Sequence, residues 1–212
     1  METFLLVLAA LFPIVNPPGT ALIFLSLTRK ASPQTRRWLA RQVAINAFFI
    51  MAASFTVGAL ILKFFGISIP VLRVAGGFIV AVTGWRLLDE GSPKTASDIE
   101  TKGRADFAKQ AFYPLTLPLT TGPGTITVMI SIGLSHTVNF NTFEFFIATF
   151  AAAVVIAAAI YICFAYSDHV ERVFGTASTD VLVRLTAFIL FCLGVQIAWA
   201  GVSELVGTLQ KT

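Results

Sequence analysis

The stretch FPIVNPPGTALIFLSL at residues 12–27 recurs in outline as LPLTTGPGTITVMISI at residues 117–132. When the two are aligned, the following residues coincide: Pro13 with Pro118, Pro18 with Pro123, Gly19 with Gly124, Thr20 with Thr125, and Ser26 with Ser131. Proline lacks the N–H that a helix needs, and glycine accepts backbone angles that other residues resist. We therefore predict two helices that are each interrupted at a Pro-Gly motif, NPPG at 16–19 and TGPG at 121–124.

The composition indicates a protein that spans a membrane several times. Hydrophobic residues make up 56% of the 212 residues and charged residues 12%, against about 25% charge in soluble domains. The net charge of +4 comes from basic residues between the apolar runs, where they set orientation, so nucleic acid is not an expected partner. Cys163 and Cys192 lie in apolar stretches and predict neither a disulfide framework nor a metal site.

The apolar runs divide the chain into two similar units. A helix that crosses a bilayer takes roughly 20 residues, and six segments qualify: approximately 3–28, 42–65, 69–88, 107–134, 143–166 and 181–207. The polar stretch DEGSPKTASDIETKGRADFAKQ at 89–110 is typical of a solvated linker. We predict an all-α integral membrane protein of six transmembrane helices, with one three-helix repeat at 1–88, a cytoplasmic linker at 89–106 and a second three-helix repeat at 107–212, together forming one membrane domain.

The distribution of charge predicts the orientation. Each repeat has an odd number of spans, so the second enters the membrane from the opposite face, as in the inverted-topology repeats of many secondary transporters. Lys and Arg gather in the loop between the first and second spans and near the linker, and the loop between the fifth and sixth spans carries Arg172 and Arg184. All of these lie on one predicted side. The other side carries only Lys63, Arg73 and Lys211. The positive-inside rule then puts both termini outside. A rival topology, with both Pro-Gly segments as re-entrant hairpins and four full spans, fits the charges nearly as well.

The third span of each repeat gives weaker support for the repeat. LRVAGGFIVAVTG at 72–84 and VRLTAFILFCLG at 183–194 both carry an Arg near the start, but their spacing differs by one residue. The small residues of AGG at 75–77 predict close packing of helices. Val80 is expected on an ordinary packing face.

The two interruptions are candidate binding sites near the middle of the membrane. About ten residues follow each one, which is close to half of a ~30 Å core at about 1.5 Å per residue. An unwound backbone at that depth needs protein or a wet cavity around it, and free N–H groups at a helix start attract anions. The backbone N–H groups, hydroxyls and amides at the two interruptions carry no fixed charge, so they suit a small zwitterion or a neutral polar solute. The predicted substrate-binding residues are Asn16, Pro17, Pro18, Gly19, Thr20, Thr121, Gly122, Pro123, Gly124 and Thr125.

Other polar side chains in the spans allow more than one interpretation. Thr116 and Thr120 extend the predicted lining. Asn46, Ser54 and Gln196 are more typical of hydrogen bonds between helices than of ligands. A single Pro-Gly motif also occurs as a simple kink in a membrane helix, and only the matched pair favours a site.

These motifs resemble those of the MarC family of multi-pass membrane proteins. The resemblance rests on NPPGT, its echo TGPGT, six spans and AGG in the third span, and it extends over residues 3–207. Some members, called SnatA, transport small neutral amino acids of the size of glycine and alanine, so the resemblance implies amino-acid transport across the inner cell membrane. The family motif positions correspond here to residues 16–20 and 122–125. Thr121 stands where the first repeat has Asn16, so the two half-sites differ chemically.

Other classes of protein fit the sequence less well than a transporter. An intramembrane enzyme needs clustered acids, nucleophiles or metal ligands, whereas the predicted topology puts His136 outside and His169 inside, and the acids lie in termini, loops or span ends. We expect no enzyme activity, no catalytic residue and no cofactor. A channel or facilitator for a small polar solute, an exporter of another metabolite, and a regulatory role remain alternatives. The expected partners are a small neutral amino acid and the lipid bilayer, and a homo-oligomer is compatible with the sequence.

The absence of a protonatable group near the predicted midplane bears on energy coupling. Proton-driven carriers commonly bury an Asp, Glu or His in a span, whereas Glu144 and Glu204 lie near span ends. The carbonyl groups of an unwound backbone, together with threonine hydroxyls, are oxygen ligands that suit Na⁺. We predict transport driven by Na⁺ or by the solute gradient, with Glu204→Gln nearly without effect.

Overall fold

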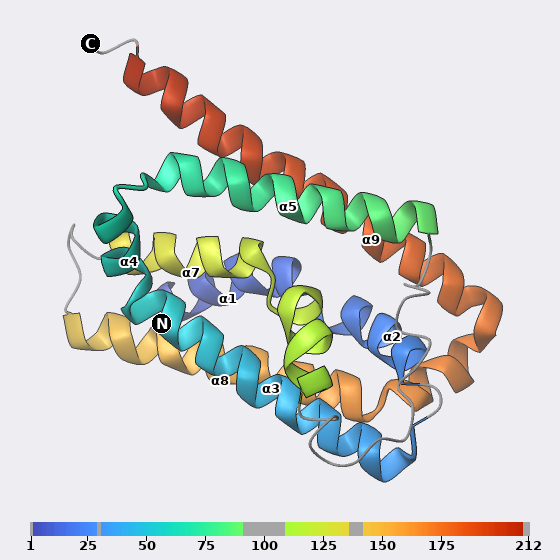
Figure 1. Ribbon diagram of the computed structural model, residues 1–212. Helices are drawn as coiled ribbons and strands as arrows, with labels where there is room; N and C mark the ends of the chain where they lie inside the picture. The colour runs from blue at the N-terminus through green and yellow to red at the C-terminus, as the bar shows by residue number, and fades with distance from the viewer. Residues whose placement is uncertain (1, 29–30, 91–108, 136–141, 210–212) are drawn as a thin grey trace.

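The computed structural model describes residues 2–28, 31–90, 109–135 and 142–209. Every regular element in these ranges is a helix (Figure 1). In chain order the elements are α1 (Glu2–Val15), α2 (Pro17–Leu27), α3 (Pro33–Thr56), α4 (Gly58–Phe65), α5 (Ile69–Glu90), the π-helical segment η2 (Ala111–Thr120), α7 (Pro123–Ser135), α8 (Thr142–Ala165) and α9 (Ser167–Leu209). Apart from its first two residues, the predicted linker at 89–106 lies outside the described residues, as does His136.

Five helical stretches of the described part are long and apolar enough to cross a membrane, the first of them combining α1 and most of α2 across Asn16. They are Glu2–Leu25, Pro33–Thr56, Ile69–Asp89, Phe143–Ala165 and Arg184–Gly207. The predicted fourth span, 107–134, is different: it consists of the short segment η2 followed by α7, whose apolar part is Pro123–Leu134. The described residues thus form only helices, several of them of membrane-spanning length, which agrees with the sequence prediction of an all-α, multi-span protein.

Three predicted boundaries are wrong. The second span, predicted to reach 65, ends at Thr56, where a turn at Val57 separates α3 from the short helix α4. Helix α3 begins at Pro33 and not near 42, because the Ser32 hydroxyl accepts a hydrogen bond from the Thr35 N–H at 3.2 Å and proline fits a first helical turn. The predicted loop between 166 and 181 is helical, since α9 starts at Ser167 and extends over 43 residues. The stretch 168–183 contains no proline to stop it. At 1.5 Å per residue α9 is about 65 Å long, so it also extends beyond the membrane core.

The contacts between helices recur in matched pairs. In Figure 1, α1 and α2 run from left to right, whereas α7 runs from right to left; α3 and α8 also run in opposite directions, as do α5 and α9. Helix α5 packs along α9 and α3 along α8. If α1, α2, α3 and α5 are exchanged for η2, α7, α8 and α9, three further pairs of contacts map onto one another: α3–α7 onto α8–α2, α1–α8 onto η2–α3, and α2–α9 onto α7–α5. Among the described residues, the contacts of α4 and that between α8 and α9 have no such counterpart.

Glycine brings the backbones of α5 and α9 together. A Cβ atom built on Gly77 would lie 2.6 Å from the Gly194 carbonyl oxygen, and one built on Gly194 would lie 2.7 Å from the Gly77 carbonyl oxygen. Gly84 and Gly201 meet the partner helix in the same way. Small residues at such contacts let membrane helices approach closely, so the packing role predicted for the AGG segment is confirmed.

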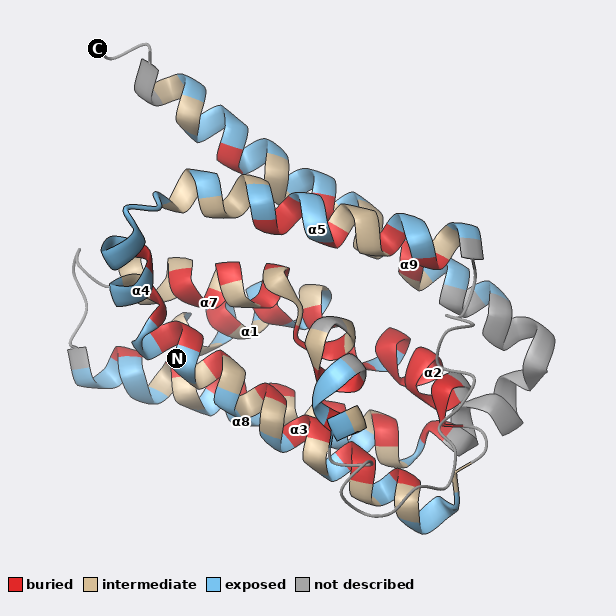
Figure 2. Cartoon of the chain, in the orientation of Figure 1, coloured by how far each residue is buried: buried red, intermediate tan, exposed pale blue. Residues whose placement is uncertain are grey.

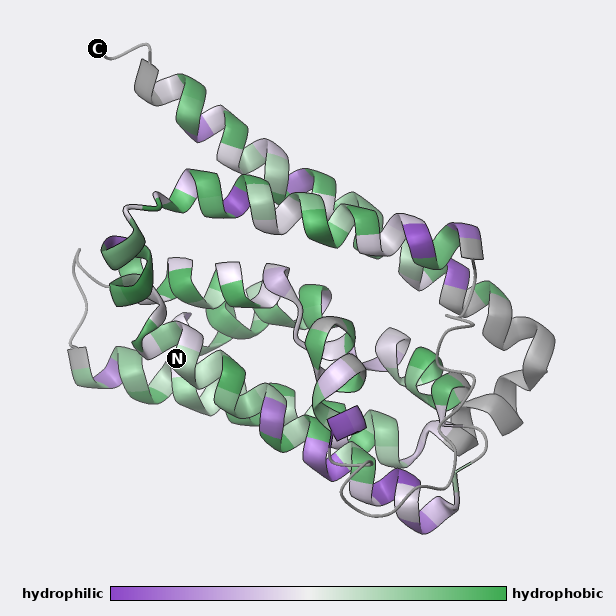
Figure 3. Ribbon diagram, in the orientation of Figure 1, coloured by the Kyte–Doolittle hydropathy of each residue, from purple (hydrophilic) through white to green (hydrophobic). Residues whose placement is uncertain are grey.

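The core and the outer surface have the distribution expected in lipid. Buried apolar side chains gather where α1, α2, α3, η2, α7 and α8 meet (Figure 2), with Leu11, Phe24, Met51 and Phe164 among the most enclosed. Hydrophobic residues also cover much of the outside (Figure 3), as at Phe64 and Trp199, which are 84% and 69% exposed. Lipid tails cover such faces in a membrane protein.

Candidate functional site

The first interruption closes on itself. Asn16 separates α1 from α2 in the left-handed region (φ 44°, ψ 62°), which asparagine tolerates better than most residues. Its side-chain Oδ1 accepts a hydrogen bond from the Gly19 N–H at 3.3 Å, and its carbonyl accepts one from the Thr20 N–H at 2.9 Å. Pro17 is the first residue of α2, where its missing N–H costs nothing. The N–H groups of Gly19 and Thr20 are therefore both occupied.

Neighbouring side chains fill the space around this first motif. A Cβ atom on Gly19 would lie 2.6 Å from Oγ1 of Thr186, on α9, so this threonine packs directly against the glycine. The Thr20 hydroxyl donates to the Asn16 carbonyl at 3.0 Å. Gly19 and Thr20 are both buried. In this conformation residues 16–20 form a packed, hydrogen-bonded junction.

The backbone before the second motif is irregular, because two residues in it directly precede prolines. Within η2, Tyr113 (φ −127°, ψ 123°) and Leu117 (φ −108°, ψ 127°) are extended. Each directly precedes a proline, and a proline disfavours helical angles in the residue before it. The hydroxyls of Thr116 and Thr120 donate to the carbonyls of Ala111 and Leu115 at 2.6 and 2.7 Å, which satisfies buried carbonyls in this irregular backbone.

The start of α7 leaves hydrogen-bonding groups unoccupied. Its first backbone bond runs from the Ile126 N–H to the Gly122 carbonyl at 3.2 Å. Among the described residues the N–H groups of Gly124 and Thr125 have no acceptor, and the buried Thr121 hydroxyl has no partner. Thr121 occupies the position of Asn16, and here no side chain caps the helix start. The positive end of α7 thus offers two N–H donors and a hydroxyl.

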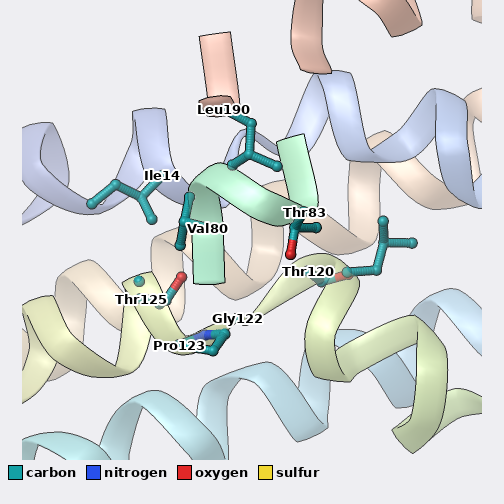
Figure 4. Close-up of a pocket in the computed structure, with 10 residues that line it drawn as sticks. Ile14, Val80, Thr83, Thr120, Gly122, Pro123, Thr125 and Leu190 are labelled. Carbon is teal, nitrogen blue, oxygen red and sulfur yellow. The ribbon is translucent and has the colours of Figure 1, made fainter. Parts of the chain in front are cut away.

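A small cavity lies against this helix start. Its volume is about 20 Å³, roughly the space that one water molecule needs. Figure 4 shows Ile14 of α1, Val80 and Thr83 of α5, and Leu190 of α9 around the turn at Gly122 and Pro123. The complete lining is Ile14, Val80, Thr83, Leu119, Thr120, Gly122, Pro123, Gly124, Thr125 and Leu190, none of which carries a charge.

The predicted site residues therefore fall into two groups. Gly122, Pro123, Gly124 and Thr125 line the cavity, and Thr121 is buried next to them in sequence. Residues 16–20 do not line it. None of the described contacts tests which of them binds a solute, so the site stays a prediction.

The secondary polar candidates have ordinary structural partners. Asn46 donates to the Thr116 hydroxyl at 3.4 Å and so joins α3 to η2, and the Ser54 hydroxyl bonds the Ile50 carbonyl of its own helix at 2.7 Å. Gln196 is exposed. Sequence reasoning missed Ile14, Thr83 and Leu190, and it placed Val80 on an ordinary face although Val80 faces Gly124 across the cavity. An apolar residue carries no local signal that distinguishes a cavity wall from other packing.

Several apolar helices around an interrupted, uncharged site define the class of the protein: an integral membrane protein. A model of the MarC family, described as integral membrane proteins, matches residues 1–206, and the chain belongs to this family. It is 34% identical over 208 residues to the inner membrane protein MarC of Salmonella typhimurium, covering 95% of this chain and 94% of that one. The MarC proteins of Escherichia coli O1:K1 and Citrobacter koseri are 34% and 33% identical over similar lengths. No solved structure matches the chain.

Proposed function

We propose that the protein is a secondary transporter of small neutral amino acids, similar in size to glycine and alanine. The observation that carries the proposal is the start of α7, where the N–H groups of Gly124 and Thr125 have no acceptor among the described residues and both residues line a cavity that has no charged wall. The buried Thr121 hydroxyl, next to them in sequence, has no partner there either. The N–H groups and the helix dipole favour a carboxylate. Carbonyls and threonine hydroxyls nearby can accept from an ammonium group, so the site suits a molecule with both charges and no net charge.

The size of the cavity favours a small solute and requires motion. A cavity of about 20 Å³ accommodates one water molecule and not an amino acid. The walls formed by α1, α5 and α9 therefore have to separate from α7 before a solute binds. Each additional methylene on the solute requires a larger separation, so glycine and alanine are favoured over longer side chains.

The arrangement of helices supports alternating access by two inverted repeats. Most helix contacts map onto one another when the halves of the chain are exchanged, and α7, α8 and α9 run opposite to α2, α3 and α5. The halves differ at their motifs: Asn16 and Thr186 close the first, whereas the second opens on the cavity. We infer that this is one of two states, and that the motifs exchange these roles in the other.

Accessibility of single cysteines tests the predicted topology. A cysteine that reports which side of the membrane it faces has to replace an exposed residue. Arg36 is unsuitable, because it is buried and its Nη2 donates to the Thr28 carbonyl at 3.1 Å. Arg37 and Glu144 are exposed. In a chain with Cys163 and Cys192 changed to Ala, Glu144→Cys should react with a membrane-impermeant thiol reagent in intact cells, and Arg37→Cys only after the cells are opened. If both variants react alike in intact cells, the re-entrant topology replaces the inverted repeat.

Transport by purified protein tests the function itself. In proteoliposomes we expect uptake of radiolabelled L-alanine to saturate and to be inhibited by glycine, as binding to a discrete site requires. An inward Na⁺ gradient or the alanine gradient should drive it, and a pH gradient alone should not, because the cavity wall has no titratable side chain. Flux that rises linearly with concentration would indicate a channel. Accumulation driven by a pH gradient without Na⁺ would contradict the proposed coupling.

A further inference from the structure

A second and larger pocket lies beside the cavity, between α5, α7 and α9. Its volume is about 340 Å³, large enough for a small amino acid. Its polar wall consists of Arg73 on α5 with Thr127 and Ser131 on α7, and α9 contributes the apolar residues Ile197 and Ala200. The function proposed above does not use this pocket.

One close contact separates the pocket from the cavity. Along α5, Arg73 lines the pocket and Val80, two turns later, lines the cavity. Between them Gly76 packs against the Thr127 hydroxyl, which itself donates to the Pro123 carbonyl at 2.8 Å. The pocket and the cavity therefore lie along one seam of α5, α7 and α9, and the contact of Gly76 with Thr127 stands between them.

The polar groups of the pocket suit a carboxylate. The Ser131 hydroxyl is buried and has no hydrogen-bond partner among the described residues. Nη1 of Arg73 lies 2.6 Å from Oε2 of Glu204, and the two side chains are 33% and 45% exposed. Ion pairs with that much exposure contribute little to stability, whereas a guanidinium has five donors in a fork that fits a carboxylate. An arriving carboxylate can therefore replace Glu204 at low cost.

We propose that this pocket is a second carboxylate-binding site, in which Arg73 exchanges Glu204 for the carboxylate of an amino acid and Ser131 donates to the same group. This rests on the proposed function, because the pocket then holds the solute before the contact between Gly76 and Thr127 opens toward the cavity. The ion pair changes the sequence-based expectation for Glu204→Gln: the variant leaves Arg73 without a competing carboxylate, so it strengthens binding in the pocket.

Protection of a thiol introduced into the pocket tests the proposal. In a chain with Cys163 and Cys192 changed to Ala, the variant Ser131→Cys is labelled with a small neutral thiol reagent in the presence of increasing L-alanine or propionate. Both probes should slow labelling. Arg73→Gln should raise the half-protecting concentration about tenfold or more, because a charge-assisted bond is lost. Glu204→Gln should lower it about two- to fivefold, the amount an exposed ion pair is worth.

The two variants of the ion pair separate binding from a structural role. An ion pair that only supports the fold would make both variants change protection in the same direction, and that result would overturn the proposal. Ala200→Cys, on the opposite wall of the pocket, repeats the measurement with Ser131 intact. Ile45→Cys, in an exposed groove between α3 and α8, should be labelled without protection by either probe.

Transport measurements distinguish this proposal from the function on which it rests. If L-alanine is transported but neither probe protects the Ser131→Cys or the Ala200→Cys variant, the second site is refuted and the transporter stands. If propionate protects both variants, with the opposite responses of Arg73→Gln and Glu204→Gln, but L-alanine is not transported, the carboxylate site stands and the proposed solute is wrong.

Discussion

Gly194→Val should destabilise the protein more than a comparable change elsewhere on α9. A Cβ atom at this position would lie 2.7 Å from both the Ala81 Cα and the Gly77 carbonyl oxygen of α5. These are backbone atoms, which cannot rotate out of the way as a side chain can, so α5 and α9 have to separate along their longest contact. Overpacking costs about 1–3 kcal/mol or more. For a chain of this size that corresponds to a fall in melting temperature of roughly 2–12 °C.

Gly207→Val is the matched control for this prediction. Gly207 lies on the same helix, and nothing stands within 4 Å of a Cβ atom built on it. The two variants thus make the same chemical change in one helix, but only at Gly194 does the new side chain meet the backbone of α5. Thermal unfolding of both proteins in the same detergent checks the expectation. Equal melting temperatures for the two variants would show that the close approach of α5 and α9 does not limit stability.

The membrane class and the family could be predicted because they depend on properties spread over the whole chain. A composition with 12% charged residues and apolar runs of membrane-spanning length leaves few alternatives. The Pro-Gly motifs also act locally: α2 begins at Pro17 and α7 at Pro123, since proline fits the first turn of a helix. The family resemblance is confirmed over residues 1–206.

The difference between the two motifs could be predicted only in part. The exchange of Asn16 for Thr121 is visible in the sequence, and it indicates half-sites that differ chemically. Its consequence depends on geometry: the asparagine reaches the Gly19 N–H, while the threonine hydroxyl has no partner among the described residues. The position of Thr186 against Gly19 depends on the packing of α9, which local sequence does not encode.

Contacts between distant segments account for the other features that sequence reasoning missed. Arg73 and Glu204 are 131 positions apart and form an ion pair. Each alone is indistinguishable from a charge that only marks the end of a span. Arg36, which the sequence marks only as a cytoplasmic charge, is buried and bonds the end of α2 through the Thr28 carbonyl. Positive charge near a span end predicts orientation, but it does not reveal the partner of the side chain.

Gly124→Ala should abolish most transport of L-alanine, and restoring the packing around it should not restore transport. The added Cβ atom would lie 2.7 Å from Cγ2 of Val80 and 3.4 Å from Cγ2 of Ile14. Valine is stiff at χ1 because it is branched at Cβ, so the clash displaces α5 from α7. In addition, the methyl group occupies much of a cavity of about 20 Å³, at the place where a carboxylate approaches the Gly124 N–H.

Removing the clash separates its two effects. In the double variant Gly124→Ala, Val80→Ala the side chain opposite the new methyl group is shortened, so the melting temperature should return toward the wild-type value. Transport should stay at least tenfold below wild type, because the methyl group still covers the N–H donors at the start of α7. Phe78→Ala, an exposed position on α5, should transport normally. If the double variant recovers both stability and transport, Gly124 serves helix packing, and the binding site has to be sought away from the start of α7.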